Sequence, residues 1–386
     1  VQTIHAFCER LLQRFPVEAG MVPGFEVMDD QTAREVLGEA RARVLAEART
    51  EPDGDTALHL ATIVGFTSAD RFDDLLKGLL SHRHTLRPLF STPNSLEAGL
   101  RQLSQLLEVD PELDAASIVE NAIDAMDITA YQHVLAGKHI AKPAREGIEN
   151  TLRAEGPEEK FTRLQDAYLT AKGELRAERG LFAKSAGTDA PDLVNFLLSE
   201  QKRIAHVTER LRAAQVYAAT SALMQVGRQI VAAYETEKRR RGLCDYDDLI
   251  SRTRELLEEK EASQWVLFKL DGGLDHVLID EAQDTSPQQW SIIARLTEEF
   301  FAGEGSQSDT ARTIFAVGDY KQSIFSFQGA DPAEFARMRK LFRAQITGVG
   351  ASLAEVPLLA SFRSTPEVLK VVDDVFAQPL AGIGLE

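Results

Sequence analysis

The stretch that most constrains the fold is residues 276–285, HVLIDEAQDT, in which an apolar run ends directly in two carboxylates. Four apolar or β-favouring residues before polar ones predict a buried parallel strand, and open α/β folds bind ligands at the carboxyl edge of such strands. A carboxylate there can hold the Mg²⁺ of a nucleotide, and its neighbour can polarise the water that attacks a γ-phosphate. We therefore assign the metal to Asp280 and the water to Glu281.

The alternative is structural: Asp280 and Glu281 only end a core strand and cap the helix that begins near Pro287. A second segment bears on the choice. Residues 313–317, TIFAV, form another strand-like run, and GDYKQSIFSFQGAD follows over 318–331. Two strand-like runs that each end in polar residues favour a shared ligand site over an isolated strand end.

The two segments resemble motifs II and III of superfamily 1A helicases, the UvrD, Rep and PcrA group with the RecB- and AddA-type motor subunits. The wording is most similar to the AddA branch. Residues 3–8, TIHAFC, are similar to that family's TxHxFC motif, and residues 359–365, LASFRST, resemble its motif IV. Four motifs in the family's order argue against a chance match and span nearly the whole chain.

The resemblance implies roles for individual residues. Catalysis is expected of Asp280, Glu281, Gln322 and Arg363, with Gln322 sensing the γ-phosphate and Arg363 acting like an arginine finger in cis. Nucleotide contacts are expected of Gln283, Asp319 and Arg363, and DNA contacts of Thr3, His5, Phe325 and Phe327. The implied cofactors are ATP and Mg²⁺. For His5 the alternative is a hydrogen-bonded structural role, and for the two phenylalanines, which would stack bases, it is burial in the core.

The fold class implied is α/β: an incomplete RecA-like P-loop NTPase motor domain (1A), a large helical 1B insertion and the start of a second motor domain (2A). The expected boundaries are 1–26 and 226–350 for 1A, 27–225 for 1B and 351–386 for 2A. Within 27–225 the periodicity predicts amphipathic helices. Asp29 or Asp30 caps one to about Ala48, Asp110–Pro111 opens one to Met126, and the longest runs over 191–241.

Three segments beside these helices carry charge. Residues 168–185 predict an exposed basic loop with an aromatic, Tyr168, and are the likeliest part of the insertion to contact DNA, which the resemblance places beside it. Residues 238–242, KRRRG, indicate a solvated helix end with a left-handed cap rather than a phosphate site. Residues 244–249, CDYDDL, are similar to the family's D[FY]xDL element and are interpreted as structural.

A Walker A loop, GxxxxGK[ST], occurs nowhere in the 386 residues. Gly137–Lys138 is the nearest imitation, with Gln132 at the first Gly and His139 at the Ser/Thr. The expectation is an internal fragment that hydrolyses ATP poorly or not at all on its own. The resemblance implies that its parent is a 3′ to 5′ DNA helicase or translocase for double-strand-break repair and recombination. Its partners would be single-stranded and duplex DNA and an AddB-like nuclease subunit.

Composition limits the remaining possibilities. The net charge of −17 argues against a protein that coats DNA through bulk electrostatics, but a motor grips DNA in a local groove. The two cysteines, Cys8 and Cys244, predict reduced packing residues of a cytoplasmic protein, and no apolar run reaches a membrane-spanning length. Two other classes stay open: a non-catalytic DNA-binding module, and a scaffold subunit of a helicase-nuclease complex.

Overall fold

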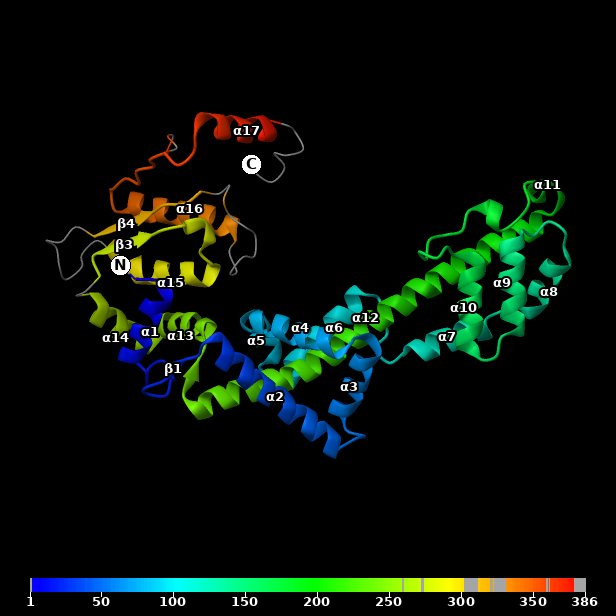
Figure 1. Cartoon of the computed structure of the whole chain (residues 1–386), viewed down its shortest axis with the longest axis horizontal. Helices are drawn as coiled ribbons and strands as arrows, with labels where there is room; N and C mark the ends of the chain where they lie inside the picture. The colour runs from blue at the N-terminus through cyan, green and yellow to red at the C-terminus, as the bar shows by residue number, and fades with distance from the viewer. Residues whose placement is uncertain are drawn as a thin grey trace. The chain divides into compact units, whose positions relative to one another are not determined.

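The structure is a computed structural model that describes residues 2–258, 260–271, 274–301, 312–319, 322, 331–358, 360 and 362–377. Within these ranges the chain is mostly helical, with two short parallel sheets of two strands each (Figure 1). It divides into two compact units. Unit 1 combines Val1–Val36 with Thr236–Glu386, and unit 2 is Leu37–Glu235. The domain identities expected from the resemblance, with their boundaries, stay a prediction.

Unit 1 is built from both ends of the chain. Its elements are α1 (Ile4–Arg14), β1 (Glu26–Val27), the start of α2 (Asp30–Thr50), the end of α12 (Pro191–Arg241), β2 (Leu243–Cys244), α13 (Tyr246–Glu258), α14 (Lys260–Asp271), β3 (His276–Ile279), η2 (Ala282–Asp284), α15 (Pro287–Thr297), η3 (Glu298–Phe301), β4 (Thr313–Ala316), α16 (Pro332–Gly348) and α17 (Pro366–Phe376). The parallel pairing of β1 with β2 joins the two parts in the same sheet.

Two apolar clusters form the core of unit 1. In the first, residues of α1 pack with α13 and bury both cysteines, which are free thiols as predicted. The second lies under β3 and β4, where Ile279 packs with Trp290 of α15 and Phe342 of α16. The opposite face of this sheet is open, because Leu278 is 70% exposed and Phe315 is 58% exposed. The prediction of a fully buried strand was therefore wrong: within the described residues only one face of the sheet is covered.

Unit 2 is a helical body. Its helices are α3 (Asp55–Phe66), α4 (Ala69–Ser81), α5 (Arg83–Phe90), α6 (Pro93–Leu106), α7 (Ala115–Asp124), α8 (Ile128–Ala136), α9 (Lys142–Arg153), α10 (Pro157–Tyr168), η1 (Glu178–Gly180) and α11 (Ala186–Asp189), with most of α2 and α12. A large apolar cluster joins α7 to α10 with α12. Two helices approach closely at Gly147 of α9, where a Cβ would lie 2.6 Å from the Cβ of Ala167 on α10.

The longest predicted helix is confirmed, since α12 is continuous over Pro191–Arg241. Gly227 does not interrupt it. A Cβ at this position would lie 2.5 Å from Leu79 Cδ1 of α4, so the glycine provides space for a packed neighbour. The predicted left-handed cap is also present, because Gly242 has φ +67°. No helix of the described residues is both long and apolar enough to cross a membrane.

Two helix starts differ from the prediction. The helix expected to open at Asp110–Pro111 begins at Ala115, and Asp114 is its cap, accepting from the Ser117 amide. The Asp110 carboxylate instead accepts from the amide of Glu112 in the preceding turn. At the N-terminus, residues 2 and 3 are not in a strand. Thr3 is the cap of α1, whereas the Asp29 cap of α2 was predicted correctly.

The basic loop at 168–185 is less open than predicted. Tyr168 is fully buried, so it presents no aromatic surface. Arg176 is fixed by hydrogen bonds from its guanidinium to the carbonyl oxygens of Asp166 and Leu169. Gln201 of α12 donates to the carbonyls of both Tyr168 and Arg176. The segment closes over the helix pair because the tyrosine ring has more apolar surface to bury than a short polar turn can leave in water.

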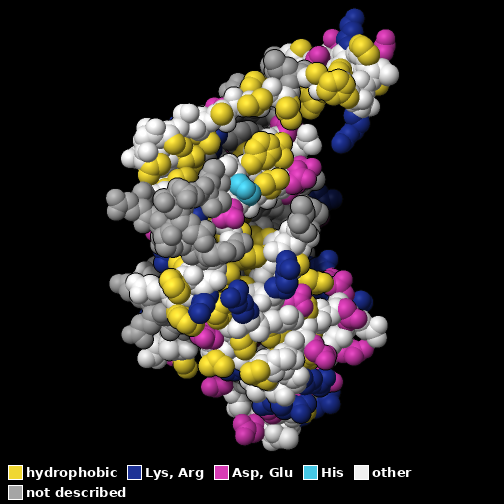
Figure 2. Space-filling view, turned by 90° about the vertical axis from the view of Figure 1, so that its left-hand side faces the viewer, with side chains coloured by type: hydrophobic (Ala, Val, Ile, Leu, Met, Phe, Trp, Pro, Cys, Tyr) yellow, Lys and Arg dark blue, Asp and Glu magenta, His cyan; other side chains and the backbone are white. Residues whose placement is uncertain are grey.

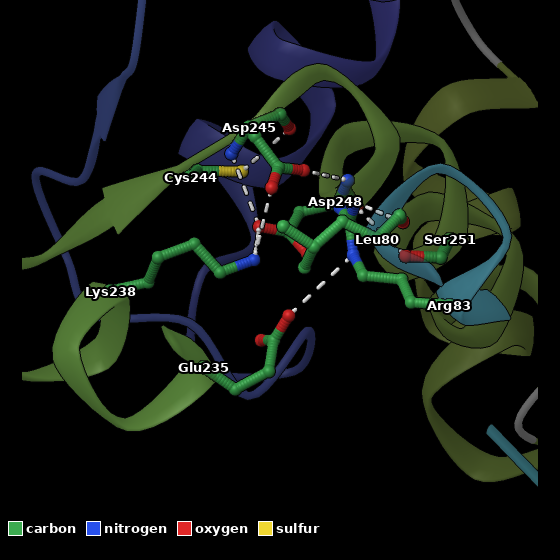
Figure 3. Close-up of polar contacts among 8 residues, drawn as sticks. All are labelled: Leu80, Arg83, Glu235, Lys238, Cys244, Asp245, Asp248 and Ser251. Atoms are coloured by element: carbon green, nitrogen blue, oxygen red, sulfur yellow. Dashed lines mark hydrogen bonds and ion pairs between the residues drawn. The ribbon is translucent and has the colours of Figure 1, made fainter. Parts of the chain in front are cut away.

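The end of α12 also corrects the sequence interpretation of a solvated basic terminus. Lys238 is buried and its Nζ lies 2.7 Å from Asp248 Oδ2 and 3.1 Å from Asp245 Oδ2 (Figure 3). The two aspartates cap α13 reciprocally, each accepting from the other's backbone amide. The CDYDDL segment is thus a buried ionic junction between α12 and α13, while Arg240 remains at the surface beside Glu237.

Candidate functional site

The carboxyl ends of β3 and β4 bring the two predicted motifs together. The strands are parallel, and Ile279 is in register with Ala316. The ladder continues beyond both strands, because the Val317 amide donates to the Ile279 carbonyl and the Ala282 amide donates to the Val317 carbonyl, both at 2.9 Å. Asp280 and Asp319, which follow these residues, therefore lie at one edge of the sheet, as the sequence predicted for parallel strands.

The two carboxylates after β3 are exposed at this edge. Glu281 has left-handed backbone angles, φ 48° and ψ 47°, which turn the chain from the strand into η2. Its amide donates to Asp280 Oδ1 at 3.1 Å. A left-handed conformation is uncommon for a residue other than glycine and is concentrated at functional sites. The turn keeps both carboxylates at the sheet edge while the chain changes direction between them.

A hydrogen-bond chain runs from this turn to the segment after β4. The Gln283 side chain donates through Nε2 to Glu281 Oε2 at 2.7 Å and accepts at Oε1 from the Asp319 amide at 3.0 Å. The Gln322 side chain then donates to Asp319 Oδ2 at 3.1 Å. Gln283 is 1% exposed, whereas Glu281, Asp319 and Gln322 are exposed. Four of the predicted site residues are therefore linked in one network.

Gly318 makes this network possible. A Cβ there would lie 2.6 Å from Gln283 Oε1 and 3.1 Å from the backbone nitrogens of Ala282 and Gln283. Any larger residue would displace the side-chain amide of Gln283 from the Asp319 N–H. Sequence reasoning assigned no role to Gly318, although its place directly after an apolar strand is a signal for close backbone approach.

The predicted DNA contacts are divided between described and undescribed residues. The Thr3 hydroxyl accepts from the Ala6 amide at 3.2 Å as a helix cap, although the residue is exposed. His5 packs edge-on against the ring of Tyr246, with ring centroids 5.5 Å apart. Burial lowers the pKa of His5, and the charge of Asp247 acts in the opposite direction. Phe325 and Phe327 lie outside the described residues.

Arg363 stands apart from the network. It is exposed in the bend before α17, and it makes no hydrogen bond or ion pair with a described residue of the site. The helix that follows buries none of its residues. The structure therefore does not bring Arg363 to the sheet edge, and its catalytic role stays a prediction, as do the nucleotide contacts of Gln283 and Asp319.

The residues present fit a cation that arrives with its own ligands. Among the described residues no group of three His, Cys, Asp or Glu side chains is arranged to hold a metal ion. Asp280 offers a single exposed carboxylate with one oxygen engaged by a backbone amide. Mg²⁺ is commonly bound by one or two carboxylates, with phosphate oxygens and waters completing the octahedron. The donor set thus suits magnesium bound to a nucleotide and does not suit a cage made by the protein alone.

The surface around unit 1 is chemically mixed. On the face drawn in Figure 2, acidic and basic side chains of the described residues are interspersed with hydrophobic ones. The exposed hydrophobic residues of the unit include Trp265 and Phe268 of α14, whose rings stack, with Lys269 over the Trp265 ring. The described part of this face is not a uniformly basic surface of the kind that binds phosphates through charge alone.

Comparison with known proteins agrees with the motifs. Residues 1–343 match the family model of the UvrD/REP helicase N-terminal domain. Similar proteins include three that are named as ATP-dependent helicase/nuclease subunits of the AddA type. Those from Enterococcus faecalis and Lactiplantibacillus plantarum are 25% and 27% identical, each over 98% of this chain and 31% of the relative. That from Moorella thermoacetica is 29% identical over 99% of this chain and 28% of its own. The chain spans about a third of the length of these relatives.

Proposed function

The chain belongs to the UvrD/REP helicase family, and from this premise we propose that the edge of the β3–β4 sheet is part of the nucleotide site of an ATP-dependent DNA helicase. The observation that carries the proposal is the network of Glu281, Gln283, Asp319 and Gln322. It joins the polar residues after two adjacent parallel strands, and this is the place where open α/β sheets bind ligands.

We propose the RecA-like motor fold for unit 1 and the 1B insertion for unit 2. Two features support the assignment. The β3–β4 pair is parallel and is covered on one face by α15 and α16, as in a layered α/β domain. The helical unit is inserted between residues 36 and 236, so unit 1 is assembled from sequence on both sides of it. The start of the second motor domain is assigned to residues 351–386 by the motif at 359–365 alone.

Each residue at the edge has a chemical task in this proposal. Bound MgATP supplies the electrophilic γ-phosphorus and neutralises part of the charge on the phosphates. Asp280 holds the cation directly or through water. Glu281 orients the attacking water and takes its proton at the carboxylate, and the left-handed turn sets the direction of this side chain. Gln322 contacts the γ-phosphate, and Arg363 reaches it from the second motor domain.

The proposal extends to the track on which the motor moves. Phe325 and Phe327 stack on successive bases, and Thr3 and His5 contact the strand where unit 1 begins. Closure around ATP shifts the bases by about one nucleotide, with 3′ to 5′ polarity, and hydrolysis reopens the cleft. The relatives are named as AddA-type helicase/nuclease subunits, which supports a role in DNA break repair and recombination with an AddB-like partner.

The test is ATP hydrolysis, with and without single-stranded DNA, by the natural full-length protein that contains these residues. We expect DNA-stimulated turnover, and we expect Glu281→Gln to lower kcat by at least about 100-fold because it removes the base. Glu298→Gln is the matched control, since Glu298 only pairs with Arg295 at the surface, and its kcat is expected to be unchanged. The 386-residue chain, which contains no Walker A match, is expected to be inactive in the same assay.

Two other outcomes would replace the proposal. If the natural protein binds single-stranded DNA but hydrolyses no ATP, the carboxylates have no catalytic role and the chain belongs to a DNA-binding module. If it neither binds DNA nor hydrolyses ATP, the helical unit becomes the functional part, as a scaffold for a partner protein.

A further inference from the structure

We infer that Gln283 is a positioning residue, whose buried side-chain amide aims Glu281 and makes that aim depend on the segment Gly318–Gln322. The inference rests on the proposed function, because it concerns the same catalytic edge. It assigns Gln283 a task different from the nucleotide contact predicted from the sequence. Its side chain lies beneath the surface at 1% exposure, and it bonds the two segments on either side of it.

The orientation of the amide is determined by its partners. The carboxylate of Glu281 can only accept, so the nitrogen end of Gln283 must face it. The backbone N–H of Asp319 can only donate, so the oxygen end must face that side. A flipped amide would place two acceptors and two donors against each other. One flip state therefore satisfies both contacts, and the Glu281 carboxylate is held in a fixed direction.

The far end of the amide contact belongs to the segment that carries the γ-phosphate sensor. Asp319 donates its N–H to Gln283 and accepts the Gln322 side chain at its own carboxylate. The Gln322 backbone amide also donates to the Asp319 carbonyl at 3.0 Å, so the two residues move together. A displacement of Asp319 removes the hydrogen bond that holds the oxygen end of Gln283. Because the amide is rigid, Glu281 then loses its orientation as well.

Packing restricts the alternatives. The backbone of Gly318 leaves room for the Gln283 oxygen, and a Cβ at 318 would occupy that space at 2.6 Å. Gln283 follows the buried Ala282 in η2, so its side chain reaches water only if this turn moves. A purely structural role would need only a filled volume. A positioning role needs the polarity of the amide, and this difference is what an experiment can separate.

The first experiment measures amide hydrogen exchange on the 386-residue chain and needs no activity. We compare the wild type with Gln283→Met, which keeps the side-chain length and removes both polar ends. The Asp319 N–H is expected to exchange about tenfold faster in the variant, as for the loss of one net hydrogen bond. Gln289→Met is the control, because Gln289 closes the cap of α15 with Ser286 and does not contact Asp319. Unchanged protection of the Asp319 amide would overturn the inference.

The second experiment is the pH dependence of DNA-stimulated ATP hydrolysis by the natural full-length protein. Gln283→Glu keeps the shape, removes the donor and places a second carboxylate beside Glu281. We expect kcat to fall about 10- to 100-fold with the KM for ATP changed less than about threefold, because orientation is lost and nucleotide affinity is not. The acid limb of the kcat profile is expected to move to higher pH, since a neighbouring negative charge raises the pKa of the base.

The controls separate this inference from the proposed function. Gln289→Glu retains a capping carboxylate, and its kcat and pH profile are expected to match the wild type. If the wild type does not hydrolyse ATP, the proposed function fails, while hydrogen exchange still decides whether the Gln283 link exists. If Gln283→Glu raises KM with an unchanged kcat and an unchanged profile, Gln283 binds the nucleotide and the positioning role is refuted.

Discussion

Replacing Lys238 by methionine tests whether the junction between α12 and α13 is a buried ion cluster on which unit 1 depends. The Lys238 side chain is 2% exposed, and its ammonium lies within 3.1 Å of a carboxylate oxygen on each of Asp245 and Asp248, which are 13% exposed. Methionine fills most of the volume of the lysine stem. The substitution therefore removes the charge and its hydrogen bonds while leaving the apolar packing of the helix end largely intact.

The expected loss follows from what the two carboxylates keep. Removing one member of a buried ion pair costs about 3 to 5 kcal/mol, because the remaining charge is left uncompensated. Here each aspartate retains one backbone donor, since Asp245 N–H bonds Asp248 and Asp248 N–H bonds Asp245. This places the cost near the lower limit, at about 3 kcal/mol. The additional repulsion between two carboxylates that shared one cation prevents a smaller value.

The assay is urea unfolding of the 386-residue chain followed by circular dichroism, with the free energy of unfolding of each transition extrapolated to water. Lys77→Met is the matched control, because Lys77 pairs with Asp74 at the same 3.1 Å but both side chains are more than half exposed. Its effect is expected to stay below about 0.5 kcal/mol. Adding Asp245→Asn and Asp248→Asn to Lys238→Met is expected to restore most of the loss, because asparagine keeps a capping oxygen without the charge. A Lys238→Met effect as small as that of Lys77→Met would refute the reasoning, as would a triple variant no more stable than the single one.

Two further predictions concern packing and pH. Gly147→Ala is expected to destabilise unit 2 by about 1 to 3 kcal/mol, because its Cβ would overlap Ala167 on α10, whereas Gly38→Ala, with open space around it, is expected to be neutral or stabilising; thermal unfolding of both variants measures this. His5 has a folded-state pKa below its ordinary value because of burial, so the unfolded chain binds its proton more readily and stability is expected to fall as pH drops below about 6.5. His5→Asn is expected to flatten that part of the stability profile, His59→Asn serves as the comparison for a second histidine whose pKa is lowered by burial, and a profile unchanged by either substitution would contradict the assignment.

Local patterns predicted the elements whose formation depends on near neighbours. The strands β3 and β4, the start of α15 at Pro287 and the whole of α12 follow from apolar runs, a capping serine and helical periodicity, and all are present. The left-handed cap at Gly242 follows from the same kind of evidence. In each case the stabilising contacts lie within a few residues along the chain, so the sequence contains the whole argument.

Competing local signals were harder to separate. Asp110 and Asp114 are both aspartates before helix-forming residues, and Pro111 favoured the first. The helix begins after the second, because Ile118, Val119 and Ala122 are then buried together on one side of it. Tertiary packing decided between two adequate caps. The same cause explains Tyr168, whose burial depends on α9 and α12 and not on its own basic loop.

Lys238 shows why a charge run is ambiguous on its own. Four cations before a glycine satisfy the helix macrodipole whether they are solvated or paired, so the residues KRRRG predict only a helix end. The partners of Lys238 follow within ten residues, in the CDYDDL segment, yet their position depends on the reversal of the chain through Gly242 and β2. Once that reversal is known, the two aspartates that cap α13 necessarily face the end of α12.

The network at the candidate site depends on an even more remote property, the register of β3 against β4. Ile279 is paired with Ala316, and the next ladder bonds place Gln283 against the amide of Asp319. A shift of one residue would exchange the faces of every side chain on one strand and move Gly318 away from the glutamine. The motif residues could therefore be predicted individually from the sequence, whereas their connection could not. Since catalysis at such an edge requires Glu281 to point in one direction, the strand register is itself part of the site, and substitutions that change it are expected to act on turnover before they act on nucleotide affinity.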